Sequence, residues 1–511
     1  MLNCYKVLFD LYCTKHKQEK AMLETLNFHP EYKEALPQLN KIEVAMLGTY
    51  YVKLAGADYL TQPLHISQET DTAKKALLWS NYLSRAEFDE IPSQTLRSNL
   101  GKLKLQNTGF TLPQRIEYLV NDCDLNGLSL VGLMNNAATA VMEYKFHLLL
   151  ADYQGLSSVA LESASIADLE RANARATIKQ YDRKNIVDWH FDRINGVMQM
   201  TYIMLREVGE EFKRDSLTRS KIESFLILAL DEDGNYYQQK IVKSADAGYI
   251  EGERNYISVG GQPLKWIPIQ IIADEELQAG NLPRDFGMLS PIVDATVSRY
   301  NVSAQYKDHQ DKLRPTTVIT GMTDQLVEQY VKVNGSMTFK WGGVNVFGGF
   351  GDQKPEIQII GAADTLDSYT KYFEDNEKKI RSLGGIFPTD DKKARTATEV
   401  ISEVADDVAR FTPLISSLEN GLKRILSYCA MFEGVMSQDS IEQQMQEQII
   451  VDIPAEFAAQ RLTVEEVKAL TELRLANPQY YTEENVTKIL MAGGWGSEEI
   501  KQLLDNGTEN D

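Results

Sequence analysis

Cysteine is scarce in this sequence, with four residues in a chain of 511. They are scattered, and none forms a C-x-x-C pair with the spacing of a zinc site. The six histidines are equally dispersed and never pair at metal-ligand spacing. We therefore expect reduced thiols in a protein made in a cytosol, and no metal site.

Sequence motifs of common enzymes and of nucleotide or metal sites are also missing. The sequence has no G-x-S-x-G motif and no Walker lysine, because the glycine-rich stretch 342–351 lacks the G-K-[ST] ending. The run Asp231-x-Asp233-x-Asn235 begins like a calcium loop but lacks the later ligands, so a hairpin turn is favoured. Asp406 and Asp407 face two directions on a helix, which favours a solvated surface over a metal site. We expect no catalytic residue, cofactor or enzymatic activity.

Long apolar runs are absent as well. No stretch reaches the roughly 18 apolar residues that a membrane-spanning helix needs, so we expect no membrane partner. Positive charge is outnumbered, with 53 Lys and Arg against 73 Asp and Glu, a formal net charge of −20. Residues 397–511 alone hold 21 acidic and 8 basic residues. This balance disfavours a general basic surface for nucleic acid and favours an acidic, solvated one.

What is present indicates a folded α+β protein. Hydrophobic residues make up 43% of the chain and charged residues 25%, which are values typical of soluble folded domains. Residues 1–110 and 115–150 are predicted to be mainly helical, including a stretch from Leu128 to Leu150. Two β-hairpins are predicted next, around Asn195-Gly196 and around 231–235, followed by a strand at 266–272. These features predict an α+β body built on one meander with packed helices.

Residues 287–434 carry the most informative pattern. A long helix is predicted over 290–312, starting at Ser290-Pro291, and β-prone runs (TTVITG, SMTFKWGG, EIQIIG) follow within 315–361. A second long helix is predicted over 364–383. Two long helices that flank a small β module make a poor catalytic pocket but a suitable tube wall.

The helix after the next loop is longer still. Thr396-x-x-Glu399 forms a capping box, and apolar residues at helical spacing continue to about Phe432. Pro413 lies inside this helix and has no N–H to donate, so we expect a bend there. The alternative is two separate helices that meet at Thr412-Pro413. Beyond it, the pattern predicts a strand at 448–453 and helices at 463–476 and 482–493.

This order of elements resembles the portal proteins of tailed bacteriophages. Further stretches are similar to one portal subfamily along nearly the whole chain. They are Tyr51-Val52-Lys53 with Gly56 and Tyr59-Leu60, YLSRAEF (82–88), YLVNDCDLNGLSL (118–130), IPIQII (267–272), MLSPIVDATVSRYNVSAQYKDHQ (288–310) and RTATEVISE (395–403). No single stretch is diagnostic, and the ordered set carries the resemblance.

The resemblance implies a ring-forming portal fold with wing, stem, clip and crown regions. Its implied boundaries are a wing at 1–286, stem helix 1 at 287–314, a clip at 315–362, stem helix 2 at 363–383, a tunnel loop at 384–395, a long kinked wing or tunnel helix at 396–436 and a crown at 437–511.

The implied function is a conduit in the virion, at one vertex of the capsid. About twelve copies, made in the host cytoplasm, would form a homo-oligomeric ring. Double-stranded DNA would pass through the ring without sequence specificity, driven in by a terminase and later ejected. Tail adaptor or connector proteins would dock on it, and the major capsid or scaffolding protein would contact it. An acidic channel wall would repel phosphates and let the duplex slide.

Two sets of residues follow as candidate sites. Lys392, Lys393 and Arg395 form a basic cluster in the predicted tunnel loop, where they would contact DNA phosphates, unless the loop is simply a solvated surface. Trp341, Phe347 and Phe350 lie among glycines in the predicted clip, where they would either dock partners or fill the clip's own core. The alternative function is a soluble α+β enzyme or a nucleic-acid-processing accessory with an unrecognised site.

Overall fold

The computed structural model describes most of the chain. The described residues are 27–154, 174–213, 217–244, 248–275, 277, 280–312, 316–320, 324–334, 356–360, 367–386, 397–454, 464–476, 478–492, 495–496 and 500. They divide into two compact units. The larger, here called the body, draws on 1–55, 90–294 and 383–511, and the smaller, here called the strut unit, draws on 56–89 and 295–382.

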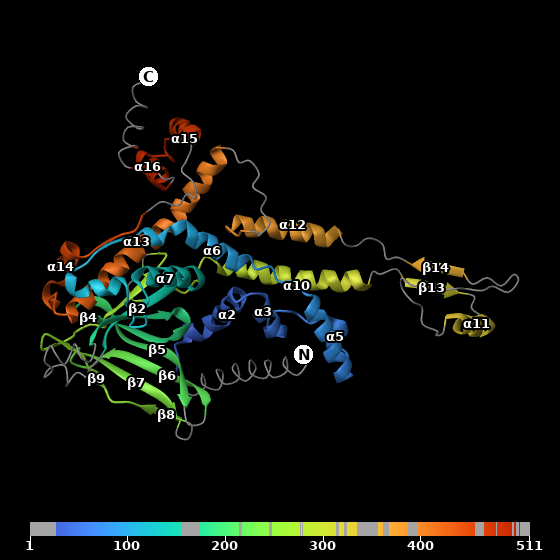
Figure 1. The fold of residues 1–511 in the computed structure, drawn as a ribbon, viewed down its shortest axis with the longest axis horizontal. Coiled ribbons are helices and arrows are strands. Elements are labelled where there is room, and N and C mark those ends of the chain that lie inside the picture. The colour runs from blue at the N-terminus through green and yellow to red at the C-terminus, as the bar shows by residue number, and fades with distance from the viewer. Residues whose placement is uncertain are drawn as a thin grey trace. The chain divides into compact units, whose positions relative to one another are not determined.

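The body combines helices and antiparallel sheets (Figure 1). Its helices are α2 (Pro30–Met46), α3 (Thr49–Ala55), α6 (Ile91–Leu103), α7 (Leu130–Tyr144), α13 (Ala397–Phe432), α14 (Ile441–Gln448), α15 (Val464–Ala476) and α16 (Glu483–Ala492), with the 3-10 turns η2 (Leu105–Asn107), η3 (Gln114–Val120), η4 (Arg183–Asn185) and η5 (Gln438–Ser440). Its strands are β1 (Gly109–Thr111), β2 (Phe146–Gln154), β3 (Arg175–Asp182), β4 (Ile186–Ile194), β5 (Val197–Lys213), β6 (Thr218–Leu230), β7 (Tyr236–Ser244), β8 (Gly248–Glu251), β9 (Asn255–Tyr256), β10 (Ser258–Val259), β11 (Gln262–Pro263), β12 (Ile269–Ala273) and β15 (Ile450–Asp452). The predicted α+β class is confirmed.

The larger sheet is a meander in the order β4-β5-β6-β7-β8, and β9 also pairs with β7. Both predicted hairpins are present, because β4 pairs with β5 and β6 pairs with β7. Asn195 and Gly196 have φ values of 52° and 87°, the two positive angles that a tight hairpin turn requires. Asp231 accepts hydrogen bonds from the backbone N–H groups of Asp233 and Asn235, so the hairpin-turn interpretation of 231–235 is confirmed.

One face of this sheet packs against the start of α2. Phe28 and Tyr32 join a core cluster with Val187, Met204, Phe225 and Ile241. The ring centroids of Phe28 and Phe225 are 5.8 Å apart. The apolar residues of alternating strand positions thus bury themselves against a helix, as a one-sided antiparallel sheet requires.

A second sheet of three strands, in the order β12-β2-β3, corrects one prediction. The helical stretch expected from Leu128 to Leu150 ends at Tyr144, and 146–154 is β2. Lys145 separates the two elements with a φ of 85°. The run Phe146-His147-Leu148-Leu149-Leu150 is buried throughout because β2 is the central strand, and periodicity alone cannot tell such a run from a buried helix.

The strut unit holds the helices and strands of the region predicted to form a tube wall. Its elements are η1 (Gly56–Asp58), α4 (Leu64–Ser67), α5 (Thr72–Arg85), α10 (Ser290–Lys312, from Ala295 onward), β13 (Thr316–Thr320), α11 (Asp324–Asn334), β14 (Glu356–Ile360) and α12 (Asp367–Ser382). The predicted helices at 290–312 and 364–383 are confirmed, as are strands at TTVIT and EIQII, which pair antiparallel. The helix α11 was not predicted, and SMTFKWGG lies outside the described residues.

Within the strut unit, α10 and α12 lie side by side and run in opposite directions (Figure 1). Asn376 on α12 donates to the carbonyl of Ala295 at 3.2 Å, and Tyr369 meets His309, further along α10, at 2.8 Å. The segment 56–89 also binds α10, since Asn301 donates to the carbonyl of Tyr59 at 2.7 Å. The two long helices are therefore partnered within a single chain.

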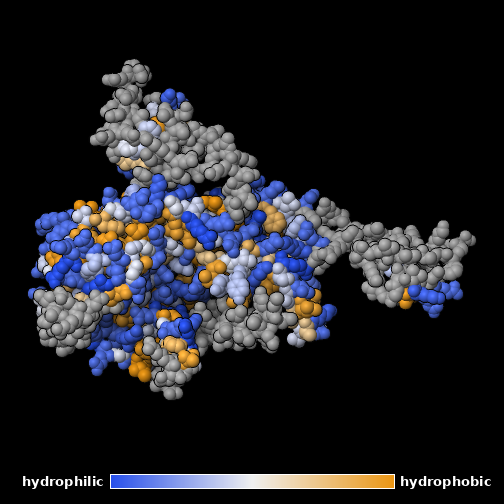
Figure 2. Space-filling model, viewed as in Figure 1, coloured by the Kyte–Doolittle hydropathy of each residue, from blue (hydrophilic) through white to orange (hydrophobic). Residues whose placement is uncertain are grey.

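The described surface visible in Figure 2 interleaves hydrophilic and hydrophobic residues. Large exposed apolar residues include Leu64 and Leu77 of the strut unit and Leu217 of the body. Among the described helices, none has the length and apolar character needed to cross a membrane.

Candidate functional site

The long helix α13 is the element around which the body is organised. It packs against β2, β3, β12, α7 and the C-terminal helices α14, α15 and α16. Its apolar face is buried, through Phe411, Leu414, Ile415, Leu418, Leu422, Ile425 and Leu426. Gly421 lets the helix approach β12 closely, because a Cβ there would lie 2.9 Å from Cγ1 of Ile272. The predicted apolar pattern at helical spacing thus became the core-facing stripe of this helix.

Pro413 lies inside α13, which is one helix from Ala397 to Phe432. The alternative of two separate helices meeting at Thr412-Pro413 is therefore wrong. Pro413 has no N–H for the carbonyl of Ala409, and the Thr412 hydroxyl donates to the carbonyl of Val408 at 2.6 Å. The predicted bend at Pro413 stays a prediction.

The first half of α13 is tied to α6 by an ion pair. Nζ of Lys102 lies 2.7 Å from Oδ2 of Asp407, with side chains 22% and 9% exposed. Asp406, the neighbouring carboxylate, is exposed. The two carboxylates do face different directions, but the prediction that both are solvated is wrong for Asp407. The half-buried ammonium of Lys102 on α6 neutralises it, and no local sequence pattern predicts that partner.

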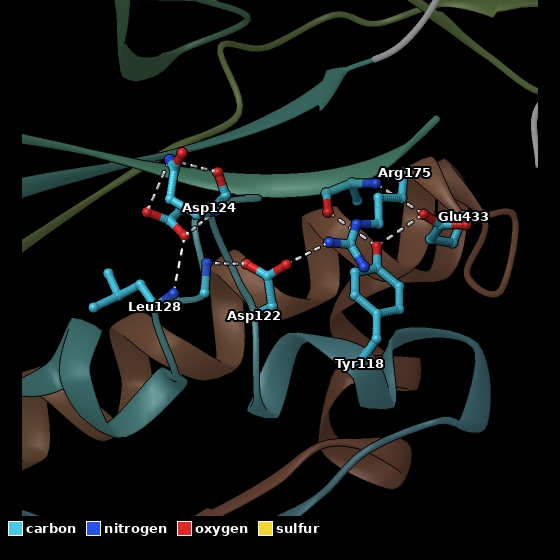
Figure 3. Close-up of polar contacts among 9 residues, drawn as sticks. Tyr118, Asp122, Asp124, Leu128, Arg175 and Glu433 are labelled. Carbon is cyan, nitrogen blue, oxygen red and sulfur yellow. Dashed lines mark hydrogen bonds and ion pairs between the residues drawn. The ribbon is translucent and has the colours of Figure 1, made fainter. Parts of the chain in front are cut away.

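The other end of α13 is held by a polar network that the sequence reasoning missed (Figure 3). Glu433, the residue after the helix, accepts a hydrogen bond from the backbone N–H of Ala176 at 2.8 Å through Oε1. The hydroxyl of Tyr118 lies 3.0 Å from the same oxygen and 2.9 Å from the carbonyl of Ala176. Burial, reinforced by the charge of Glu433, raises the pKa of Tyr118 far above its usual range. The phenol therefore stays protonated and acts as a donor.

Arg175 joins this network to the turn that precedes α7. Its guanidinium lies 4.9 Å from the ring centroid of Tyr118, and its Nη2 lies 2.5 Å from Oδ2 of Asp122. The other oxygen of Asp122 accepts the N–H of Gly127 at 2.9 Å. That backbone bond lowers the pKa of Asp122, desolvation opposes the shift, and Arg175 lowers it further.

Asp124 completes the turn by accepting the N–H groups of Asn126 at 2.8 Å and Leu128 at 3.1 Å through Oδ1. The stretch 118–130 is thus a folded turn whose side chains connect η3, β3 and the end of α13 (Figure 3). The spacing Asp122-x-Asp124-x-Asn126-Gly127 is a local turn signal that sequence reasoning could have used. Its distant partners Arg175 and Glu433 had no such signal.

The network consists of hydrogen bonds and one ion pair that connect the turn, β3 and the end of α13. Among the described residues, no group of three or more His, Cys, Asp or Glu is placed to hold a metal ion. Cys123 lies in the turn and is buried, and that burial raises its pKa to about 12. Cys429 on α13 is also fully buried, and burial raises its pKa strongly too. Both thiols stay protonated at neutral pH and are poor nucleophiles.

Most of the candidate site residues predicted from the sequence lie outside the described part of the chain. This holds for Lys392, Lys393 and Arg395 of the predicted tunnel loop and for Trp341, Phe347 and Phe350 of the predicted clip. Of the candidate site residues, Pro413 is described, and it lies in α13. The roles assigned to the two clusters stay predictions.

Comparison with known proteins gave likenesses to solved structures alone. No protein-family model matches the chain, and no curated protein matches it. A chain in the virion of a native gene transfer agent particle is 11% identical, with a TM-score of 0.37 over 87% of this chain and 96% of that one. A chain in the neck of an empty particle of the same kind is 11% identical, with a TM-score of 0.36 over 86% and 97%. Likenesses this weak carry no argument about function.

Proposed function

We propose that this chain is the subunit of a portal-type ring in a virion, a channel through which double-stranded DNA enters and leaves a capsid. The observation that supports the proposal is the strut unit. The helix α10 runs out to a small β module, β14 leads back into α12, and α12 returns along α10 in the opposite direction. A rigid helix pair that carries a β module at its end is suited to repeat around an axis as a tube wall.

The contacts within the strut unit indicate which surfaces of α12 remain for neighbouring copies in such a ring. The aromatic residues Tyr369, Tyr372 and Phe373 of α12 face α10 of the same chain, where Arg299 lies over the ring of Phe373 and Tyr306 meets that ring edge to face. The opposite face of α12 carries the exposed residues Lys371, Glu374, Asp375, Lys378 and Lys379. We therefore expect the seam between neighbouring copies to be more polar than two isolated apolar struts would make it.

The net charge of the chain favours DNA that slides through the ring over DNA that binds tightly to its wall. Each chain carries a formal charge of −20, so a ring of about twelve copies would present a strongly acidic wall to DNA phosphates. The cluster Lys392, Lys393 and Arg395 would then form a local basic collar, with salt-dependent phosphate contacts that carry no sequence information. The chain itself would supply no ATP chemistry. A terminase would provide it while docked at the clip, and tail adaptors would dock there later.

Measuring the shape and mass of the purified particles tests the proposal. Negative-stain images and native mass measurements of the purified chain should show rings with a central hole. Compact monomers would overturn the proposal and favour the alternative, a soluble α+β enzyme or nucleic-acid-processing accessory. Val297→Asp, which puts a charge on a half-buried position of α10, should reduce ring formation while circular dichroism stays unchanged. Gln305→Asp puts the same side chain on an exposed position of that helix and serves as its matched control.

The DNA-facing role has its own test. A Lys392→Ala, Lys393→Ala, Arg395→Ala triple variant should still form rings but should package DNA or retain the genome abnormally. Normal packaging, retention and ejection would remove the collar and leave the ring proposal standing. Trp341→Ala rings should likewise lose affinity for the terminase or the adaptor, and normal affinity for both would remove Trp341 from the docking role.

A further inference from the structure

The face of the larger sheet that packs against α2 continues beyond its buried part. β5 and β6 pair without a break in register from Tyr202 to Lys213, so alternate residues of β5 after Met204 lie on that same face. Two of them are Val208 and Phe212, which are 58% and 48% exposed. Arg219 lies over one side of the Phe212 ring, at 5.4 Å from its centroid. The two residues form a partly uncovered apolar strip at the end of the face, here called the open strip.

The same stretch of β5 also has an open edge. β4 pairs with β5 along its whole length, and the first residue of β4, Ile186, meets Leu205. Past Leu205, as far as Lys213, none of the described strands pairs with β5 on that side. Exposed apolar side chains beside an unpaired strand edge favour association with other chains, so native proteins normally cover such a region.

The N-terminal part of the chain enters the body beside the open strip. The N–H of His29 donates to the carbonyl of Val187 at 3.0 Å, and Val187 follows the residue of β4 that pairs with Leu205. Phe28 packs on the same face of the sheet, in the core cluster. Because Val208 comes three residues after Leu205, the point of entry lies about 10 Å from Val208 along the strand.

Residues 1–26 precede this point of entry and lie outside the described part of the chain. Their length is sufficient to cover the strip, because a helix of 26 residues spans roughly 39 Å, whereas Phe212 lies about 24 Å beyond Leu205. The sequence of this segment is predicted to be mainly helical, and helical spacing gathers five of its apolar residues on one side. These are Cys4, Tyr5, Leu8, Leu11 and Tyr12.

We propose that residues 1–26 fold back onto the open strip of their own chain and cover Val208 and Phe212 with their apolar side. The segment is joined to the body beside the strip, so its effective concentration there is on the order of millimolar or higher. A second copy or a separate partner protein would have to compete with that concentration. The contact removes apolar surface from water and shields the edge of β5 from other chains.

Cross-linking of thiols tests the proposal. Cys123 and Cys429 are buried, which leaves the two cysteines of the segment, Cys4 and Cys13, for a maleimide reagent. Glu210→Cys adds a thiol in the middle of the open strip, at an exposed position of β5. A short bismaleimide should then join position 210 to the segment within one chain. Peptide mass spectrometry of the single-chain band from a denaturing gel detects this product.

Ser220→Cys is the matched control. Ser220 is also exposed, and it lies at a position of β6 whose side chain points to the opposite face of the sheet. A thiol there should join the segment in much lower yield than one at position 210. Leu8→Asp, combined with Glu210→Cys, should lower the yield, because a charge on the apolar side of the segment opposes its burial. Asn3→Asp puts the same side chain outside that apolar side and should leave the yield unaltered.

The alternatives give different products. Equal yields at positions 210 and 220 would show that the segment stays undocked, and would overturn the proposal. Products of twice the chain's mass, without the single-chain product, would overturn it in favour of a second copy. The absence of any product with Glu210→Cys, or an unchanged yield in Leu8→Asp, would overturn it as well. A denaturing gel separates links within a chain from links between chains, so these outcomes do not depend on whether the chain forms a ring.

Discussion

The body and the strut unit hold their long helices in different ways. In the body, α13 packs on β12, β2 and α7 through aliphatic side chains such as Leu418 and Leu422, which have no exposed surface. In the strut unit, α12 meets α10 through hydroxyl and aromatic groups. The hydroxyls of Ser298 and Tyr372 are 2.7 Å apart, and Arg299 lies 4.9 Å from the ring centroid of Phe373.

This difference matters because the two kinds of contact contribute differently to stability. Burying an aliphatic side chain contributes about 1.5–3 kcal/mol to stability. A partly exposed hydrogen bond contributes about 1 kcal/mol, because it replaces hydrogen bonds that the same groups make to water in the unfolded chain. Directional contacts fix the register of two helices but leave polar surface that another chain can bind. The body therefore has the features of a stable platform, and the strut unit those of an element whose remaining surface is available to partners.

A substitution in the aliphatic interface of the body should lower stability the most. Leu418→Ala should lower the free energy of unfolding by about 2–5 kcal/mol, because it leaves a cavity between α13 and its neighbours. Leu77→Ala makes the same change in α5 of the strut unit, where Leu77 is 62% exposed, and should cost less than about 0.5 kcal/mol. Urea denaturation followed by circular dichroism measures both. Equal losses of stability would contradict the greater contribution assigned to the aliphatic interface of α13.

The next effect concerns Glu143, a half-buried carboxylate near the end of α7 in the body. Burial raises the folded-state pKa of Glu143 to about 7, while the unfolded chain has the ordinary value near 4.3. The unfolded state therefore gives up its proton first as pH rises, so this residue costs stability progressively from about pH 4.5 to about pH 7. Glu143→Gln should be more stable than the wild type by about 2–3 kcal/mol at pH 8, and equal to it near pH 4.

Unfolding curves at several pH values check this expectation. Glu117→Gln, at an exposed position, should follow the wild type at every pH. A variant Glu143→Gln that is less stable than the wild type at pH 8 would contradict the assigned cost of the buried charge.

A smaller effect should come from the network at the end of α13. Glu433→Ala removes the acceptor for the N–H of Ala176 and for the hydroxyl of Tyr118, and should cost about 1–3 kcal/mol. Glu433→Gln keeps one acceptor oxygen and should cost less. Thermal unfolding of both variants, with Tyr118→Phe alongside, measures the network. An unchanged unfolding temperature in Glu433→Ala would show that this network does not stabilise the body.

The smallest effect belongs to the strut unit. Tyr372→Phe removes the hydroxyl that meets Ser298 and should cost about 0.5–1 kcal/mol, because the pair is exposed and water replaces the lost partner. Denaturation of this variant beside Leu418→Ala compares the two interfaces directly. A loss for Tyr372→Phe as large as that for Leu418→Ala would mean that the strut helices depend on their polar contacts for stability, and that water does not substitute for them.

Much of the local structure could be predicted from the sequence. The helices at 290–312 and 397–432, both hairpins and the strand at 450–452 follow from periodicity, from proline and from turn residues, all of which act over a few positions. The errors have local causes too. The strand β2 replaces part of the predicted helix because it is central and apolar on both faces, and the segment 315–361, predicted to be β-rich, also contains the helix α11.

The class of the fold, much of the order of its elements and the acidic character of the chain follow from the sequence, because they depend on composition and on residues a few positions apart. Which residues act together depends on how distant elements pack. Glu433 meets Tyr118 across 315 positions, Asp407 meets Lys102 across 305, and Glu143 of α7 lines one pocket with Asp182 of β3. A local sequence pattern indicates whether a side chain prefers water or apolar surroundings. It cannot indicate the partner of that side chain, because the partner depends on how elements far apart in the sequence pack together.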